Sequence, residues 1–171
     1  MIIDFSCHLI SMRVSQYVEK AGCYGPNNLM RHPLQNADPE VRLALMEKYG
    51  VDIQVLSQTT PVLIGFNAGE AAEICRMSND DNYAMCKAYP NKFVKLCIFS
   101  LLDVKDALKE LDCAVNELDC RGITLASNQN GKGLDFEEFY PFYEKVIRYD
   151  LPIFFHPVQW ESYPLVNARK G

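Results

Sequence analysis

Short apolar runs alternate along the chain with longer segments that carry a helical repeat. The runs are nearly continuous in apolar residues, as expected of strands buried on both faces, and lie at 2–5, 51–57, 92–99, 122–126 and 151–156. The segments between them place apolar residues at intervals of three and four, and lie at 39–49, 67–89, 103–118 and 136–149. This alternation predicts an α/β fold with a parallel sheet.

Capping residues define several of these boundaries. Asp38 precedes Pro39 at the start of one predicted helix, Gly50 ends that helix, and Pro90 ends the next one. Residues 9–38 are rich in glycine, proline and asparagine, and we expect an irregular excursion there. We find no linker and therefore expect one domain over residues 1–171.

Composition narrows the function classes. The chain has 171 residues, 49% of them apolar, and a net charge of −5, which argues against nucleic acid or an anionic membrane as partner. No apolar run approaches the roughly 20 residues of a membrane span, and the N-terminus lacks the features of a signal peptide. We therefore expect a cytoplasmic protein, whose seven cysteines form no C-x-x-C pair and are mostly reduced.

Two of the three histidines follow or end predicted strands. His8 comes just after the first strand and His156 ends the fifth, whereas His32 lies within residues 9–38 and has no assigned role. No glycine-rich fingerprint follows the first strand, which disfavours a dinucleotide-binding sheet. In a barrel of eight βα units the strand ends meet at one mouth, so His8 and His156 are candidates for one metal site.

Several stretches resemble one family in both order and spacing. They are IDFSCH at residues 3–8, DPEVRLALMEKYGVDIQVLSQTTPV from residue 38, NDDNYAMCKAYPNKF from residue 79, and GITLASNQNGKGLDFEEFYPFYEKVIRYDLPIFFHP from residue 122. The chain is similar to the amidohydrolase superfamily, in the branch that contains aminocarboxymuconate-semialdehyde decarboxylase. The resemblance implies a partial TIM-type (β/α)8 barrel with about five of its parallel strands present.

The resemblance also implies a divalent metal, Zn or Mn, bound by His8 and His156. The family carries a histidine two residues before His8, where this chain has Ser6. A neutral hydroxyl is a poor zinc ligand, so Ser6 argues against a complete metal site. Cys7 does not replace it, because neighbouring strand residues point to opposite faces.

On the substrate side, the resemblance places the loop after the second strand and the segment after His156 beside the metal. Gln58, Thr59 and Trp160 are the candidate contacts to a small aromatic or muconate-type carboxylic acid, and Trp160 could equally anchor a loop. Arg42 and Arg76 lie on predicted helices, where a solvated position is the simpler interpretation than binding a substrate carboxylate.

The number of strands raises a further expectation. A complete barrel of this type takes about 250 residues, so 171 residues predict a truncated barrel with exposed edges at its first and fifth strands. The chain is then either a fragment of a longer protein or a naturally short relative. We expect a second copy, a partner chain or the missing half of the barrel to cover those edges, unless a different strand order lets residues 9–38 and the C-terminal tail do so.

Three functions remain open from the sequence. The first is a metal-dependent decarboxylase or hydrolase, and the second is a truncated or degenerate barrel that serves as a binding or assembly module without catalysis. A thiol enzyme that pairs Cys7 with His8 is a weaker third, because adjacent strand residues do not face each other.

Overall fold

The computed structural model describes residues 1–21, 38–59 and 63–158 of the chain. The strands are β1 (Ile3–His8), β2 (Ile53–Ser57), β3 (Phe93–Lys95), β4 (Cys97–Ile98), β5 (Ile123–Ala126), β6 (Asn128–Gln129), β7 (Lys132–Gly133) and β8 (Ile153–His156). The helices are α1 (Met12–Lys20), α3 (Pro39–Tyr49), α4 (Ala68–Ala88), α5 (Val104–Asn116), the 3-10 turn η2 (Glu137–Phe139) and α6 (Tyr140–Arg148).

The main strands form one parallel sheet in the order β1, β2, β3–β4, β5, β8. β1, β2 and β3 pair in parallel, and so do β4, β5 and β8. The two groups join at Leu96, whose N–H donates to the Leu56 carbonyl of β2 at 2.8 Å. The N–H of the next residue, Cys97, donates to the Gly122 carbonyl, also at 2.8 Å. The predicted α/β architecture of alternating parallel strands and helices is therefore confirmed.

Helix boundaries follow the capping residues that the sequence provides. The Asp38 side chain accepts from the backbone N–H of Glu40, and Gly50 ends α3 with a left-handed φ of 68°. At the start of α4, Asn67 and Glu70 form a reciprocal capping box. These local hydrogen bonds satisfy terminal backbone groups, which explains why the predicted bounds lie close to the observed ones.

Two predicted boundaries need correction. The first strand continues to His8 rather than ending at Phe5, and its pairing with β2 shifts register between Asp4 and Cys7. The expectation of irregular structure over 9–38 is wrong for residues 12–20, which form α1. Ser11 caps this helix, and apolar residues one turn apart bury one side of it; residues 22–37 lie outside the described residues.

The polar segment after β5 forms an antiparallel hairpin, β6–β7. Its turn is Asn130-Gly131, with φ values of 51° and 87°. Asn-Gly is the preferred pair for a two-residue hairpin turn, because both positions need positive φ. The Asn128 side chain accepts from the Gly131 N–H at 2.9 Å and fixes the turn beside the end of β5.

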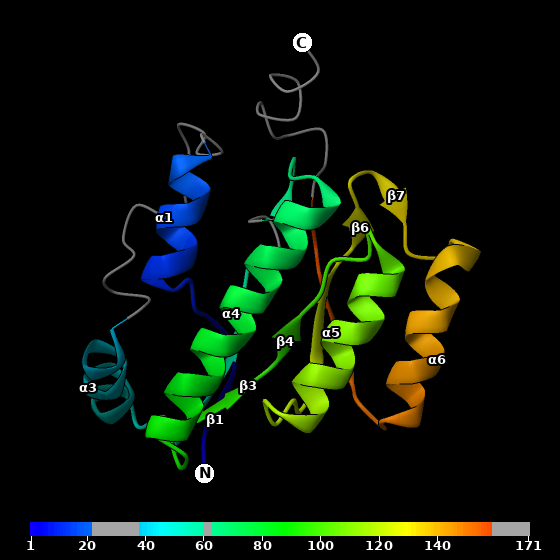
Figure 1. Ribbon diagram of the computed structural model, residues 1–171. Helices are drawn as coiled ribbons and strands as arrows, with labels where there is room; N and C mark the ends of the chain where they lie inside the picture. The colour runs from blue at the N-terminus through cyan, green and yellow to red at the C-terminus, as the bar shows by residue number, and fades with distance from the viewer. Residues whose placement is uncertain (22–37, 60–62, 159–171) are drawn as a thin grey trace.

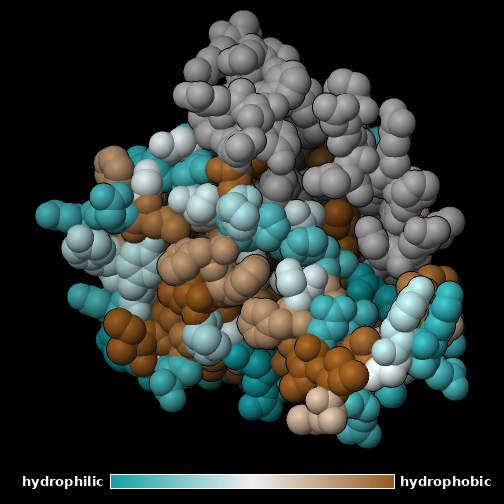
Figure 2. All heavy atoms as spheres, turned by 180° about the vertical axis from the view of Figure 1, so that it is seen from behind, coloured by the Kyte–Doolittle hydropathy of each residue, from teal (hydrophilic) through white to brown (hydrophobic). Residues whose placement is uncertain are grey.

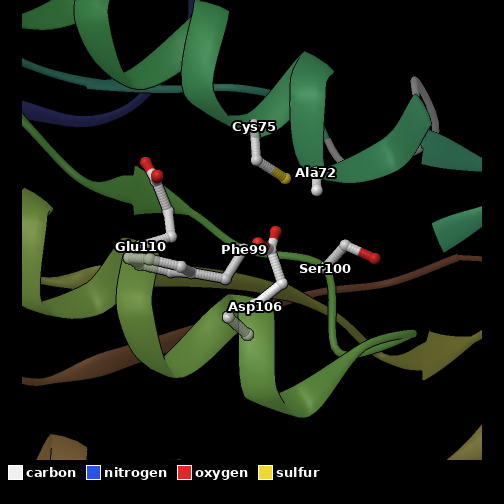
Figure 3. Close-up of a pocket in the computed structure, with 7 residues that line it drawn as sticks. Ala72, Cys75, Phe99, Ser100, Asp106 and Glu110 are labelled. Carbon is white, nitrogen blue, oxygen red and sulfur yellow. The ribbon is translucent and has the colours of Figure 1, made fainter. Parts of the chain in front are cut away.

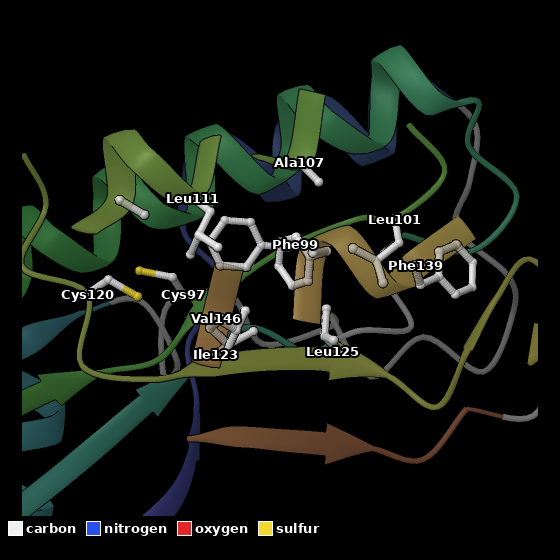
Figure 4. Close-up of a cluster of buried hydrophobic side chains, with 12 residues drawn as sticks. Cys97, Phe99, Leu101, Ala107, Leu111, Cys120, Ile123, Leu125, Phe139 and Val146 are labelled. Atoms are coloured by element: carbon white, nitrogen blue, oxygen red, sulfur yellow. The ribbon is translucent and has the colours of Figure 1, made fainter. Parts of the chain in front are cut away.

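Helices cover one face of the sheet, as Figure 1 shows for α3, α4, α5 and α6. The largest apolar cluster lies between β4, β5, α5 and α6 and is drawn in Figure 4. Phe99 and Phe142 are at its centre, with ring centroids 5.4 Å apart. Two further clusters lie beneath α1 and α4 and beneath α3, so each helix is held to the sheet by buried apolar contacts.

The face seen from behind carries apolar side chains at the surface (Figure 2). On the outer strands, Ile3 is 49%, Phe5 52% and Phe155 51% exposed. The first and last strands thus expose apolar side chains in the described part of the chain, and a partner that covers the two strand edges stays a prediction. Within the same residues, no helix combines the length and hydropathy that a bilayer crossing requires.

Candidate metal centre

His8 and His156 meet although 148 positions separate them in the sequence. They end the two outermost strands, β1 and β8, and their Nε2 atoms are 3.4 Å apart. Further along the same two strands, the rings of Phe5 and Phe154 are in edge contact, with centroids 5.6 Å apart. The sheet is therefore curved enough to bring its first and last strands together across its open face, as the wall of a barrel would.

The separation of the two Nε2 atoms fits coordination of a single ion. Two nitrogens each about 2.1 Å from an ion, at a roughly tetrahedral angle, lie about 3.4 Å apart. The observed 3.4 Å between His8 Nε2 and His156 Nε2 matches this spacing. Two of the donors that a divalent metal needs are thus already arranged by the fold.

Neighbouring groups favour the ring state that binds a metal. His156 Nδ1 lies 3.0 Å from the Pro157 carbonyl oxygen. Because a carbonyl only accepts, that nitrogen carries the proton, and Nε2 keeps its lone pair. Burial, and then the proximity of the His156 ring, lowers the pKa of His8, which favours the neutral form of this ring. The His8 Nδ1 lies 3.4 Å from Ser57 Oγ.

Arg42 holds the end of β1 from the helix side. Its Nη2 donates to the His8 carbonyl, and its Nη1 donates to Gln54 Oε1 at 3.1 Å. The solvated position expected for Arg42 is wrong, because the residue is only 6% exposed. Arg76, in contrast, is on the surface and pairs with Asp106 at 3.1 Å. Arg42 positions the backbone of a candidate ligand, a role that helical periodicity alone does not indicate.

The two residues before His8 differ in environment. Cys7 is buried beside Met46 and Leu56 on the helix-covered side, as the alternation of β1 predicts. Burial, followed by hydrogen bonding and charge interaction with Asp4, raises the pKa of its thiol to about 12. A thiol in that state is a poor nucleophile, which disfavours the thiol-enzyme hypothesis. Ser6 is exposed and lies in the register shift of β1.

The predicted substrate residues are placed unequally. Gln58 has no exposed surface, and its Oε1 accepts from the Ser78 hydroxyl of α4 at 3.2 Å. Thr59 is also buried, whereas Trp160 lies outside the described residues. Contact between substrate and any of these three stays a prediction. Over the described ranges, no group of three or more His, Cys, Asp or Glu side chains is arranged to hold a metal.

A separate hollow lies between α4 and α5 (Figure 3). Cys75 and the carboxylates of Asp106 and Glu110 line it together with Phe99 and Ser100. Burial raises the pKa of both Cys75 and Glu110. No histidine lines it, and the candidate metal centre is therefore the His8–His156 pair at the strand ends.

Comparisons with known proteins agree with this fold. The profile of the family described as Amidohydrolase matches residues 3–166, so the chain belongs to the amidohydrolase family. It is 33% identical over 126 residues to 2-amino-3-carboxymuconate-6-semialdehyde decarboxylase of Dictyostelium discoideum, covering 72% of this chain and 34% of that protein. It is 30% identical over 125 residues to gamma-resorcylate decarboxylase of Rhizobium radiobacter, covering 69% and 38%.

Solved structures show the same architecture. The chain matches 5-carboxyvanillate decarboxylase of Novosphingobium aromaticivorans with a TM-score of 0.82 and 21% identity, covering 99% of this chain and 55% of that one. It matches a dihydroxybenzoic acid decarboxylase of Polaromonas with a TM-score of 0.77 and 23% identity, covering 99% and 52%. Both of those structures contain bound manganese. The chain thus spans about half of these structures and about a third of the curated relatives.

Proposed function

We propose that this chain provides part of the metal centre of a decarboxylase that acts on a small aromatic or muconate-type carboxylic acid. The observation that carries the proposal is the 3.4 Å separation of the two Nε2 atoms, one at each outer strand end. The relatives described above are decarboxylases of such acids, which supports the reaction class. Hydrolysis of such a substrate is the alternative reaction within the same family.

The residues of this chain have definable roles in such a centre. His8 and His156 would hold a divalent cation, with manganese favoured by the related structures and zinc the alternative. When bound, the cation supplies a Lewis acid that polarises a substrate oxygen. Pro157 orients one imidazole through its carbonyl, while Arg42 fixes the backbone of the other. The exposed side chain of Phe5 and the loop that carries Thr59 are candidates for contact with the acid substrate.

A second candidate function is a module that binds or assembles without catalysis. Ser6 stands where the family has a ligand, and the described residues bring only two imidazoles together. A catalytic zinc centre generally takes about three protein ligands. If these two imidazoles bind metal without a third ligand, the chain would retain the family's fold without its chemistry.

Calorimetric titration of the purified 171-residue chain with MnCl2 and ZnCl2 tests the centre itself. We expect one ion per chain, with affinity reduced at least about tenfold in His8→Ala and in His156→Ala, since each removes one of two donors. His32→Ala is the matched control, because it removes the third histidine, to which no role is assigned. Equal binding by all three variants would overturn the assignment of His8 and His156.

Release of CO2 then separates the two functions. The manganese-loaded chain is incubated with 2,6-dihydroxybenzoate, 5-carboxyvanillate and a carboxymuconate semialdehyde. Release that depends on both histidines supports the decarboxylase. Metal binding by both histidines without any CO2 release from these acids contradicts catalysis and supports the non-catalytic module.

A further inference from the structure

A second group of reactive side chains lies where β3 is followed by β4 and where β5 begins. Lys95 at the end of β3, Cys97 at the start of β4 and Cys120 before β5 are all buried, at 2%, 0% and 7% exposure. Lys95 Nζ donates to Cys97 Sγ at 3.1 Å. Figure 4 shows the sulfur atoms of Cys97 and Cys120 pointing toward each other.

The backbone fixes the two cysteines against one another. The Cys97 N–H and the Cys120 thiol both donate to the Gly122 carbonyl, at 2.8 and 3.3 Å. A Cβ at Gly122 would lie 2.7 Å from Leu96 Cδ2 and 3.2 Å from Pro152 Cγ. A side chain at this position would have to displace the end of the buried Leu96 side chain, so glycine favours the close approach that holds Cys120 beside Cys97.

The charge of Lys95 explains why this pair of thiols is unusual. Among the described residues, no carboxylate lies within ion-pair distance of its ammonium, whose nearest contacts are the Cys97 sulfur and, at 5.8 Å, the Tyr83 ring. A buried cation is costly without an anion. One thiolate shared by Cys97 and Cys120 supplies that anion.

The acidity of the thiols agrees with this charge balance. Hydrogen bonding with Cys97 lowers the pKa of Cys120 to about 7, with help from the Gly122 backbone and Lys95. The same interaction and burial raise the pKa of Cys97. The largest cause of both pKa shifts is the contact between the two thiols, in contrast to the buried Cys75, whose pKa burial raises.

We propose that Lys95, Cys97 and Cys120 form a peroxide-sensitive dithiol centre that oxidises to a Cys97–Cys120 disulfide. The sulfur of the pair that carries the negative charge attacks one oxygen of a peroxide; an S–O bond forms, the O–O bond breaks, and hydroxide leaves with the electron pair. The remaining thiol of the pair then attacks the resulting sulfenic acid; an S–S bond forms, the S–O bond breaks, and the thiol proton leaves with the hydroxyl as water. The sulfur atoms lose two electrons, and the peroxide gains them.

Mass spectrometry of the intact chain tests this directly. After treatment with one equivalent of hydrogen peroxide and alkylation in denaturant, we expect two of the seven thiols to be protected, with a loss of two hydrogen atoms. Lys105 and Lys109 lie between the two cysteines, so trypsin releases them on separate peptides that the disulfide joins. First oxidation at any other cysteine, or no Cys97–Cys120 link, overturns the proposal.

Two variants test the roles within the centre. Lys95→Met removes the cation while keeping a long side chain, and should slow oxidation at pH 7 about tenfold, the effect of one pKa unit on the thiolate fraction. Cys97→Ser should leave a sulfenic acid on Cys120 that dimedone traps. Cys113→Ser, which removes a partly buried thiol of α5, is the matched control and should oxidise like the unmodified chain. An unchanged rate in Lys95→Met contradicts the role given to the ammonium.

Discussion

Replacement of Asn79 by alanine should destabilise the fold severely. Asn79 is a fully buried residue of α4. Its Nδ2 donates to the Ile98 carbonyl at 3.1 Å, and its Oδ1 accepts from the Ile98 N–H at 2.8 Å. The amide therefore satisfies both backbone groups of one residue in β4, as a neighbouring strand would. The same Nδ2 also donates to Glu110 Oε1 at 3.1 Å.

The magnitude follows from the groups left without partners. Each buried polar group that loses its hydrogen bond costs roughly 1–3 kcal/mol, so the two Ile98 groups together give about 4 kcal/mol. With a urea m-value of about 2 kcal/mol per molar, the midpoint of urea unfolding should fall by about 2 M. Far-UV circular dichroism across a urea series measures this shift.

A matched control distinguishes the loss of this buried amide from the loss of an exposed asparagine side chain. Asn116→Ala removes an exposed asparagine at the end of α5, whose side chain donates to the Asp112 carbonyl at 2.8 Å. Its unfolding free energy should change by no more than about 0.5 kcal/mol. If Asn79→Ala behaves like Asn116→Ala, the strand-like role of Asn79 is wrong.

Three other substitutions have directions set by the structure. Gly122→Ala should lower the unfolding free energy by about 1–3 kcal/mol, because its Cβ would lie 2.7 Å from Leu96 Cδ2; a thermal melt that is unchanged would contradict this close approach. Burial raises the pKa of Glu110 above its usual 4.5, so the folded state holds this proton more tightly than the unfolded state. Its contribution to stability therefore grows as the pH falls through the raised pKa and is complete below 4.5. Glu110→Gln should remove that part of the pH dependence of the unfolding free energy, measured by urea titration. The same pH dependence in the variant and the unmodified chain would disprove this. Ser6→His restores a ligand type two residues before His8 and should tighten manganese binding at least about tenfold by calorimetry; an unchanged affinity would show that the register shift of β1 turns residue 6 away from the ion.

Much of the fold was predictable because local signals and the apolar pattern agree. Asp38, Gly50 and Asn67 form their caps through side-chain or backbone conformations that depend on a few neighbours only. The helices α3 and α4 therefore begin and end near the predicted residues. The missed helix α1 is short, and the glycine- and proline-rich residues that follow it masked its pattern.

The site was predictable only in part, because it depends on contacts between distant segments. Strand ends in a parallel α/β fold share one edge, which is why His8 and His156 could be paired from the sequence. The register shift in β1 and the burial of Arg42 depend on how β1 packs against β2 and α3, and a one-dimensional pattern does not contain that information.

The cysteines were predicted to be mostly reduced, which does not describe the chemistry of the pair. Cys97 and Lys95 are two residues apart in a run that indicates only a strand. Their partner Cys120 comes from another part of the chain through the close approach at Gly122. A lysine within an apolar strand is the one signal in the sequence that points to a buried counter-charge.

Histidine NMR during a manganese titration tests the metal centre most directly, because the chain has only three histidines. Mn²⁺ broadens the signals of protons close to it. The account predicts that the ring signals of His8 and His156 broaden together at substoichiometric Mn²⁺, in the unmodified chain and in His32→Ala alike. Broadening of only one of the two, or of neither, would contradict a shared ion between the strand ends.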